Sequence, residues 1–319
     1  FLIRKITGRS ATAIVVSSLW AVHPVLTEAV SWVSNQSSLI FFSFFILSVL
    51  ALLKYKENRS KKIFLWSSYL FFAFSLLSKE TTLGGIFVIG VIFLFYFKNY
   101  FKEFTPFVLV GAAYLFIRYQ ILGSLGDHAL RGSFLENLAL APAIFLKYLA
   151  LSVWPFNLML DYSNYPLPSG FLDARVIFGI LFFGIFGLLI WRASKKSALF
   201  FSFGLVWFAS FLLPVLQIIP FQDIIGERFL YAPIMGFFLS AVAGFEYVTN
   251  RLNLKLKFYL NFIGLILIMV IFSFFLFLTF NRNNNWLNSE NLWLSVLRLD
   301  AENERALQNI SAYYLEKRN

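Results

Sequence analysis

Long apolar runs separated by short charged loops constrain this chain more than any other feature of its sequence. Of its 319 residues, 59% are hydrophobic and only 13% are charged, whereas a soluble domain carries about 25% charged residues. The core of a soluble domain cannot absorb that excess, so lipid is implied as the solvent. The sequence therefore predicts an all-α, polytopic transmembrane protein.

The apolar runs predict nine membrane crossings. A spanning helix takes about 17–25 residues, and the runs approach this length once their interfacial flanks are counted. The predicted crossings are residues 11–25, 38–53, 63–78, 82–97, 105–121, 176–191, 198–216, 232–248 and 258–280.

A further apolar run, residues 137–154, breaks the alternation of inner and outer loops. A crossing there would place the loop from Pro155 to Arg175 in the cytoplasm and set the next span against the positive-inside rule. We therefore expect a helix that lies in the interface or re-enters from the outer side, for which Pro142 and Lys147 are suited. The alternative is a tenth crossing with a weak charge bias.

The net charge of +11 is better explained by membrane orientation than by nucleic-acid binding. Basic residues lie in short loops between apolar runs and not on one soluble face. Residues 54–62, 98–103, 192–196 and 250–257, with the start of the chain, define the cytoplasmic side. There is no cysteine, which excludes a disulfide framework, a thiolate nucleophile and a zinc–thiolate site. No metal-binding motif is found, and no metal site is expected.

The composition changes after Phe280. Residues 281–319 are more acidic and place Leu292, Val296 and Leu299 at helical spacing. Two parts are therefore predicted: a transmembrane module over 1–280 and an extracytoplasmic helical tail over 281–319.

The densest group of polar residues in the outer loops begins at His23. Pro24, Glu28 and Trp32 share one face of a helix, so a carboxylate and an indole are placed to point together into a cavity. Imidazole and carboxylate groups at a lipid boundary are costly unless they face water or each other. The alternative is a hydrated interfacial helix cap without chemistry.

Lys79 lies on the predicted outer side and so departs from the positive-inside pattern. It ends an apolar run and is followed by Glu80 and two threonines. An anion such as a lipid phosphate would compensate its charge. The alternative is a local ion pair of Lys79 with Glu28 or Glu80.

Arg228, in the stretch GERFLYAP, is a second outer cation. Arginine suits bidentate binding of phosphate, whereas the alternative is an ion pair with Glu227 or Asp223. Asp161, in LDYSNYP, is a candidate carboxylate, although Asp before Tyr-Ser also suits a simple turn. Tyr231 follows at a helix start and is a weaker candidate.

The order of these motifs resembles that of the transmembrane and tetratricopeptide-repeat (TMTC-like) proteins over nearly the whole chain. The most specific parts are HPVLTEAV and ERFLY, and SKETT lies between them. The tail is similar to the beginning of a tetratricopeptide array, with Ala306, Asn309, Ile310 and Tyr314 at repeat-like positions.

This resemblance implies a GT-C glycosyltransferase that takes part in O-mannosylation. Such an enzyme moves a mannose-like sugar from polyprenyl phosphate to protein Ser/Thr hydroxyls at the outer or lumenal face, with the lipid-linked sugar as substrate and no cofactor. A carboxylate removes the hydroxyl proton while cations stabilise the departing phosphate. The assigned residues are Lys79 and Arg228 for the donor phosphate, His23, Glu28 and Asp161 for catalysis and pocket organisation, and Glu80, Glu227 and Tyr231 in support.

Two departures from the family limit these assignments. The main catalytic acid of the family is expected in an outer loop before Phe1, so we expect a fragment that lacks its first spans and is inactive alone. The chain also reads Asn35, Gln36, Ser37 and Ser38 where the family often has Gly-Arg-x-Asp, so a charged role there is not carried over.

Two other classes of function compete with the enzyme. One is a non-catalytic membrane scaffold that binds proteins through its repeats. The other is a transporter, which is disfavoured because the spans are nearly free of ionisable residues away from their outer ends. The expected partners are a polyprenyl-phosphate sugar, an acceptor protein and membrane lipids, without nucleic acid. Richness in Phe, Ile, Asn and Lys favours a prokaryotic cell membrane over the endoplasmic reticulum.

Overall fold

The protein is helical throughout the residues that its computed structural model describes, which are 1–97, 101–124, 134–168, 170–194, 198–218 and 223–317. These residues contain no strand, so the predicted all-α class is confirmed for them. The α-helices are α1 (Leu2–Thr7), α2 (Ser10–Ala21), α3 (Thr27–Ser31), α4 (Ser37–Glu57), α5 (Ile63–Ser78), α6 (Gly85–Tyr96), α7 (Thr105–Leu122), α8 (Phe134–Val153), α9 (Ala174–Ser194), α10 (Leu199–Leu212), α11 (Pro233–Thr249), α12 (Leu254–Asn285), α13 (Ser289–Leu297) and α14 (Glu304–Glu316). Short 3₁₀ helices join some of them: η1 (Pro24–Leu26), η2 (Val33–Asn35), η3 (Glu80–Gly84), η4 (Phe101–Glu103), η5 (Leu213–Val215) and η6 (Glu227–Leu230).

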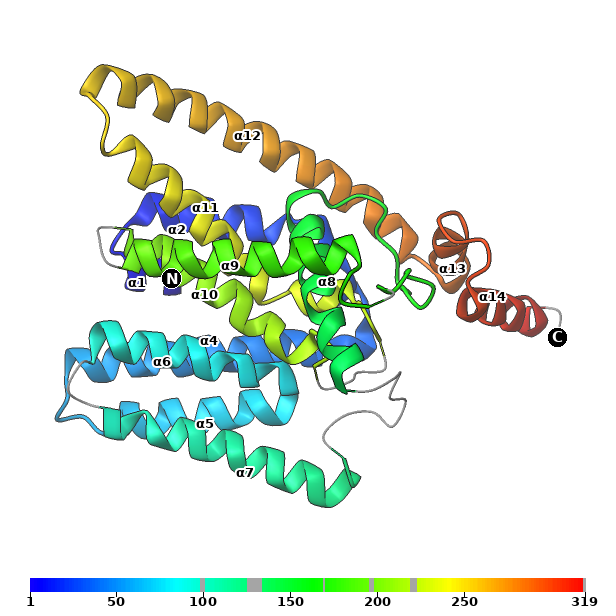
Figure 1. Ribbon diagram of the computed structural model, residues 1–319, viewed down its shortest axis with the longest axis horizontal. Helices are drawn as coiled ribbons and strands as arrows, with labels where there is room; N and C mark the ends of the chain where they lie inside the picture. Colours follow the sequence, from blue (N-terminus) through cyan, green and yellow to red (C-terminus); the bar gives the residue numbers. More distant parts are fainter. Residues whose placement is uncertain (98–100, 125–133, 169, 195–197, 219–222, 318–319) are drawn as a thin grey trace.

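Most of the helices run along the long axis of the molecule (Figure 1). Helices α4 to α7 form one side of the bundle, and α2, α9, α10 and α11 form the other. The long helix α12 leaves the bundle at one end and leads to α13 and α14 at the other.

Three helical stretches among the described residues are long and apolar enough to cross a membrane, judged by length and composition: Val33–Glu57, Phe101–Leu122 and Leu254–Asn285. The bent pair Ser10–Ala21 and Pro24–Ser31 would make a fourth. The remaining predicted crossings are shorter apolar helices. Helix α6 has 12 residues and is about 18 Å long, against a hydrocarbon core of about 30 Å. The apolar helices are thus present, while the count of nine crossings exceeds what length alone supports.

Helix α8 covers the run that was expected not to span. It contains Pro142, buries Phe145 and Tyr148, and packs against α9. Figure 1 shows it crossing the long helices steeply near the end that leads to the tail. Its depth in a bilayer stays a prediction.

Serine side chains lock α4 to α5. Ser48 Oγ donates to the carbonyl of Ser68 at 2.7 Å, and Ser68 Oγ donates to the carbonyl of Ser48 at 2.8 Å. Ser75 Oγ donates to a further α4 carbonyl at 2.8 Å. Because these bonds fix the register of the two helices, the first turn of α4, with Ser38, lies beside Lys79 at the end of α5.

Backbone contact joins α10 to α11. A Cβ atom on Gly204 would lie 2.5 Å from the carbonyl oxygen of Gly236, and one on Gly236 would lie 2.7 Å from that of Gly204. Small residues permit such an approach between apolar helices. Trp207 Nε1 donates to the carbonyl of Ala232 at 2.9 Å, so the segment that begins α11, directly after η6, is held against α10.

The tail packs onto the loop between α8 and α9. Leu160 of that loop is buried with Val296 of α13 and Ala306 of α14. Helix α12 continues to Asn285, past the boundary predicted at residue 280, so the tail begins on an unbroken extension of the last apolar helix.

Candidate functional site

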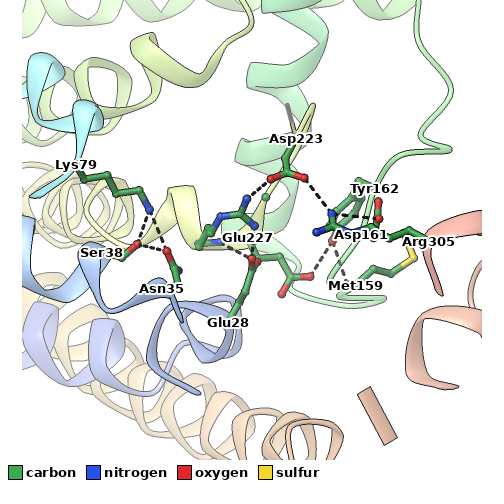
Figure 2. Close-up of polar contacts among 12 residues, drawn as sticks. Glu28, Asn35, Ser38, Lys79, Met159, Asp161, Tyr162, Asp223, Glu227 and Arg305 are labelled. Carbon is green, nitrogen blue, oxygen red and sulfur yellow. Dashed lines mark hydrogen bonds and ion pairs between the residues drawn. The ribbon is translucent and has the colours of Figure 1, made fainter. Parts of the chain in front are cut away.

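Several predicted residues meet at the end of the bundle that faces the tail. Lys79 follows α5, Glu28 lies in α3 and Glu227 begins η6. Figure 2 shows these side chains in one band with Asp161 and Asp223. Segments that lie up to 200 residues apart in sequence therefore form one polar cluster.

Glu28 and Arg228 form an ion pair at the centre of this cluster. The Glu28 side chain is 0% exposed and its Oε1 accepts from Arg228 Nη1 at 2.5 Å. Its Oε2 accepts from the backbone N–H of Arg228 at 3.0 Å. Arg228 Nη2 also pairs with Asp223. The structure thus supports the ion-pair interpretation of Arg228, with Asp223 as predicted and with Glu28 as a partner that was not.

Lys79 is buried beside neutral groups. It is 8% exposed, and its Nζ donates to Ser38 Oγ at 2.5 Å and to Asn35 Oδ1 at 3.3 Å. Nζ also lies 5.4 Å from the ring centroid of Phe229. Within the described residues no carboxylate oxygen comes within 4.0 Å of Nζ, so neither predicted ion pair, with Glu28 or with Glu80, is formed.

Burial, with a smaller contribution from the positive charge of Arg228, lowers the pKa of Lys79 to about 8, against the opposing charges of Glu80 and Glu28. Taking a cation out of water disfavours its charged form. The site therefore contains a positive charge that the surrounding protein compensates only in part.

Unused hydrogen-bonding groups lie next to this cation. Asn35 Nδ2 and Thr81 Oγ1 are buried and have no partner among the described residues. Asn35 contacts Lys79 directly, and Thr81 follows it by two positions. Buried polar groups are nearly always satisfied, so a polar ligand at Lys79 would find free donors there.

Glu227 connects η6 to the loop between α8 and α9 and to α12. Its side chain is 0% exposed, Tyr162 donates its hydroxyl to Oε1 at 2.9 Å, and Arg282 Nη2 lies 3.3 Å from Oε2. Burial raises the pKa of Glu227; the charge of Arg282 opposes this shift and that of Glu28 adds to it. Glu227 is placed to hold the site together, and Tyr162 and Arg282 are members that the sequence did not reveal.

Asp161 is occupied by local contacts. It is 4% exposed, and its Oδ1 accepts from the backbone N–H of Ser163 at 2.7 Å. Its Oδ2 lies 3.5 Å from Arg305 Nη1, which is also 3.3 Å from Asp223 Oδ1. The first contact forms the turn considered as the alternative, and the second attaches the tail to the site.

His23 is buried away from the charged band. Its Nδ1 accepts from the backbone N–H of Val25 at 3.3 Å, and its Nε2 lies 3.2 Å from the carbonyl of Ser152. These bonds assign the ring proton to Nε2 and engage both nitrogens with the backbone. In this arrangement His23 orients the turn before η1.

Glu80 and Tyr231 lie at the margins of the cluster. Glu80 Oε2 is 3.9 Å from Arg118 Nη1, and the carbonyl of Tyr231 accepts from Trp20 Nε1 at 2.9 Å. Among the described residues no three His, Cys, Asp or Glu side chains are arranged to hold a metal ion.

Comparison with known proteins tests the resemblance that the motif order suggested. The chain is 25% identical over 342 residues to protein O-mannosyl-transferase TMTC3 of Homo sapiens, an alignment that covers 94% of this chain. It is 24% identical over 365 residues to protein O-mannosyl-transferase TMTC4 of Homo sapiens, covering 99% of this chain. The resemblance to TMTC-like proteins is confirmed.

The alignments cover only part of the length of these relatives. The chain spans 36% of the length of human TMTC3 and 48% of that of human TMTC4. No protein-family model matches the chain, and no solved structure matches it. TMTC3 of Mus musculus aligns like its human counterpart, at 25% identity, so the prediction of a prokaryotic source gains no support.

Proposed function

We propose that this TMTC-like chain provides the donor-phosphate site of a multi-pass membrane glycosyltransferase. The enzyme would move a mannose-like sugar from a polyprenyl-phosphate donor to Ser/Thr hydroxyls of proteins at the outer or lumenal face. Relatives named protein O-mannosyl-transferases support a transferase of this kind. The observation that carries the proposal is the buried ammonium group of Lys79, which lacks a carboxylate partner within the described residues.

A phosphate at Lys79 would explain why a cation is retained there. A buried charge without a partner is strongly unfavourable, and ionisable groups near a lipid phase usually mark a binding site. Asn35 Nδ2 and Thr81 Oγ1 would supply two further hydrogen bonds. Lys79 would then stabilise the charge that develops on the departing phosphate.

An apolar groove supports a lipid-linked donor. It has a volume of about 440 Å³ and lies between α5 and α7, with Leu76, Leu77, Val110 and Ile117 among its apolar walls and Arg118 in its lining. Leu77 precedes Lys79 by two residues, so the groove reaches the end of α5 at which Lys79 lies, and an isoprenoid chain in it would carry its phosphate to that end of the bundle.

Arg228 is better suited to positioning than to direct phosphate binding. Both of its terminal nitrogens are engaged, by Glu28 and by Asp223. Its guanidinium carbon lies 4.9 Å from the ring centroid of Phe229, the ring that also faces Lys79. We assign to Arg228 and Glu28 the task of fixing η6 beside Lys79. The proton acceptor is assigned to neither Glu28 nor Asp161, because both are already paired.

The test uses membranes that contain the full-length protein and a radiolabelled polyprenyl-phosphate mannose. Lys79→Ala should lower transfer to protein by about a hundredfold, the loss typical of removing one group that stabilises developing charge. Lys79→Arg should retain part of the activity. Lys62→Ala is the matched control, because Lys62 is exposed at the opposite end of the same helix, α5, and it should transfer like wild type. Wild-type transfer by Lys79→Ala would overturn the proposal. Absence of transfer from every such donor, with partner proteins still captured by the tail, would favour the scaffold.

A further inference from the structure

We propose that a second, separate pocket at the opposite end of the bundle binds the phosphate of an anionic phospholipid in the cytoplasmic leaflet. The pocket has a volume of about 180 Å³, and its lining includes Arg9, Phe200, Phe201, Tyr247, Asn250 and Arg251. It lies where α10 begins, α11 ends and the chain turns from α1 into α2. In Figure 1 these connections are at the end of the bundle away from α13 and α14, the end that the loop charges assign to the cytoplasm.

The charge of this pocket is positive and only partly balanced. Arg9 pairs with Glu246, which is not part of the lining, and Glu246 also accepts from Thr12 Oγ1 at 2.5 Å. Arg251 has no carboxylate within 4.0 Å among the described residues, and it lies 4.2 Å from the ring centroid of Tyr247. Arg251 is therefore available to bind an anion. Arg9 lies beside it and shares its partner, Glu246, with Thr12.

Each of the two guanidinium groups lies near an aromatic ring. Arg251 rests on Tyr247, and the guanidinium carbon of Arg9 lies 5.9 Å from the ring centroid of Phe200. The planar fork of arginine matches phosphate oxygens in pairs. Helix α10 begins at the same place, and its N-cap residue, Ala198, has no side-chain acceptor for the first backbone N–H groups, which adds favourable partial charge.

Position favours a lipid headgroup over free phosphate as the occupant. Basic pockets between membrane helices on the cytoplasmic side face an anionic leaflet and bind lipid headgroups. The aromatic walls Phe200 and Phe201 belong to an apolar helix, so an acyl chain can continue along the bundle from the phosphate. Inorganic phosphate has no such apolar portion to bury.

The experiment titrates the purified full chain in detergent with three probes and follows the midpoint of thermal unfolding. The probes are dihexanoyl phosphatidylglycerol, dihexanoyl phosphatidylcholine and inorganic phosphate. The wild type should show a saturable rise in midpoint with phosphatidylglycerol alone. Arg251→Gln should raise the apparent Kd for phosphatidylglycerol about tenfold or more, because a pair of charge-assisted hydrogen bonds is lost. Arg251→Lys should give an intermediate Kd.

Lys255→Gln is the matched control. It removes the same charge from the exposed start of α12 but does not line the pocket, so its Kd should equal that of wild type. Equal weakening by Lys255→Gln, no saturable response of the wild type, or an equal response to inorganic phosphate would each overturn the lipid site. Because no sugar transfer is measured, this result is independent of the function proposed above.

Discussion

Replacing Lys79 by methionine should make the protein without donor more stable. The pKa of Lys79 falls from 10.5 to about 8 on folding, which corresponds to roughly 3 kcal/mol of unfavourable burial at neutral pH. Methionine fills a similar volume without charge, and Ser38 Oγ still donates to Asn35 Oδ1 at 3.0 Å. Since the hydrogen bonds of the ammonium group are lost, we expect a gain of about 1–3 kcal/mol in the free energy of unfolding.

The dependence on pH follows from the direction of the shift. A lysine whose pKa is lowered by folding imposes its full penalty below pH 8, where it is charged in both states. Between pH 8 and 10.5 the folded protein loses this proton first, so the contribution of Lys79 to stability becomes less unfavourable as pH rises. The advantage of Lys79→Met should therefore be largest near pH 7 and shrink towards pH 10.5.

Thermal unfolding of both proteins in one detergent, followed by tryptophan fluorescence across this pH range, measures the difference. Polyprenyl phosphate should stabilise the wild type and leave Lys79→Met unchanged. The contrary result is a methionine variant that is less stable than wild type at pH 7, by an amount that does not vary with pH. It would mean that the fold itself compensates the charge of the ammonium group. The argument for an anion at Lys79 would then fail.

Three further outcomes are expected. The affinity for polyprenyl phosphate should weaken about tenfold between pH 7 and pH 9, because only protonated Lys79 binds the anion, and Lys79→Arg should abolish this dependence in the same titration. Arg228→Ala should destabilise the fold by about 3–5 kcal/mol, since it leaves the fully buried Glu28 without its guanidinium partner; thermal unfolding measures this, and an unchanged midpoint would contradict it. Gly204→Val should lower the free energy of unfolding by about 1–3 kcal/mol, because it separates α10 from α11. Gly123→Ala strains a left-handed turn but its added Cβ meets no neighbouring atom, so it should lower the free energy of unfolding by less in the same thermal unfolding experiment.

The sequence predicted the apolar helices. It also predicted that Lys79, Glu28 and the other candidate site residues lie at one end of the molecule. Hydropathy is a local property, so it located α4 and α12 well, and loop charge placed Lys79 and Glu28 on one side. The TMTC-like motif order was also legible from the sequence alone. What the sequence could not give was the number of true crossings, because helices such as α6 are short and their fit to a bilayer depends on tilt and neighbours.

Pairing within the cluster could not be predicted from periodicity. Arg228 reaches Glu28 across 200 positions in the chain, and no local signal distinguishes that partner from Glu227, its immediate neighbour. The bond from Tyr162 to Glu227 was missed for the same reason, since a tyrosine in an outer loop looks like an interfacial anchor. The bonds between buried serines of α4 and α5 were missed as well, because hydropathy does not show which carbonyl a serine hydroxyl will meet.

The close contact of Gly204 with Gly236 has a consequence for how a lipid substrate could come and go. Helices α10 and α11 approach so closely at these glycines that a single added Cβ atom would clash, whereas α7 buries only Phe107 and Gly111. We therefore expect the α10–α11 pair to keep its position and α7 to be the helix that moves more easily. We expect substrate exchange to proceed sideways, from the bilayer past α7, while the charged end of the molecule keeps its shape.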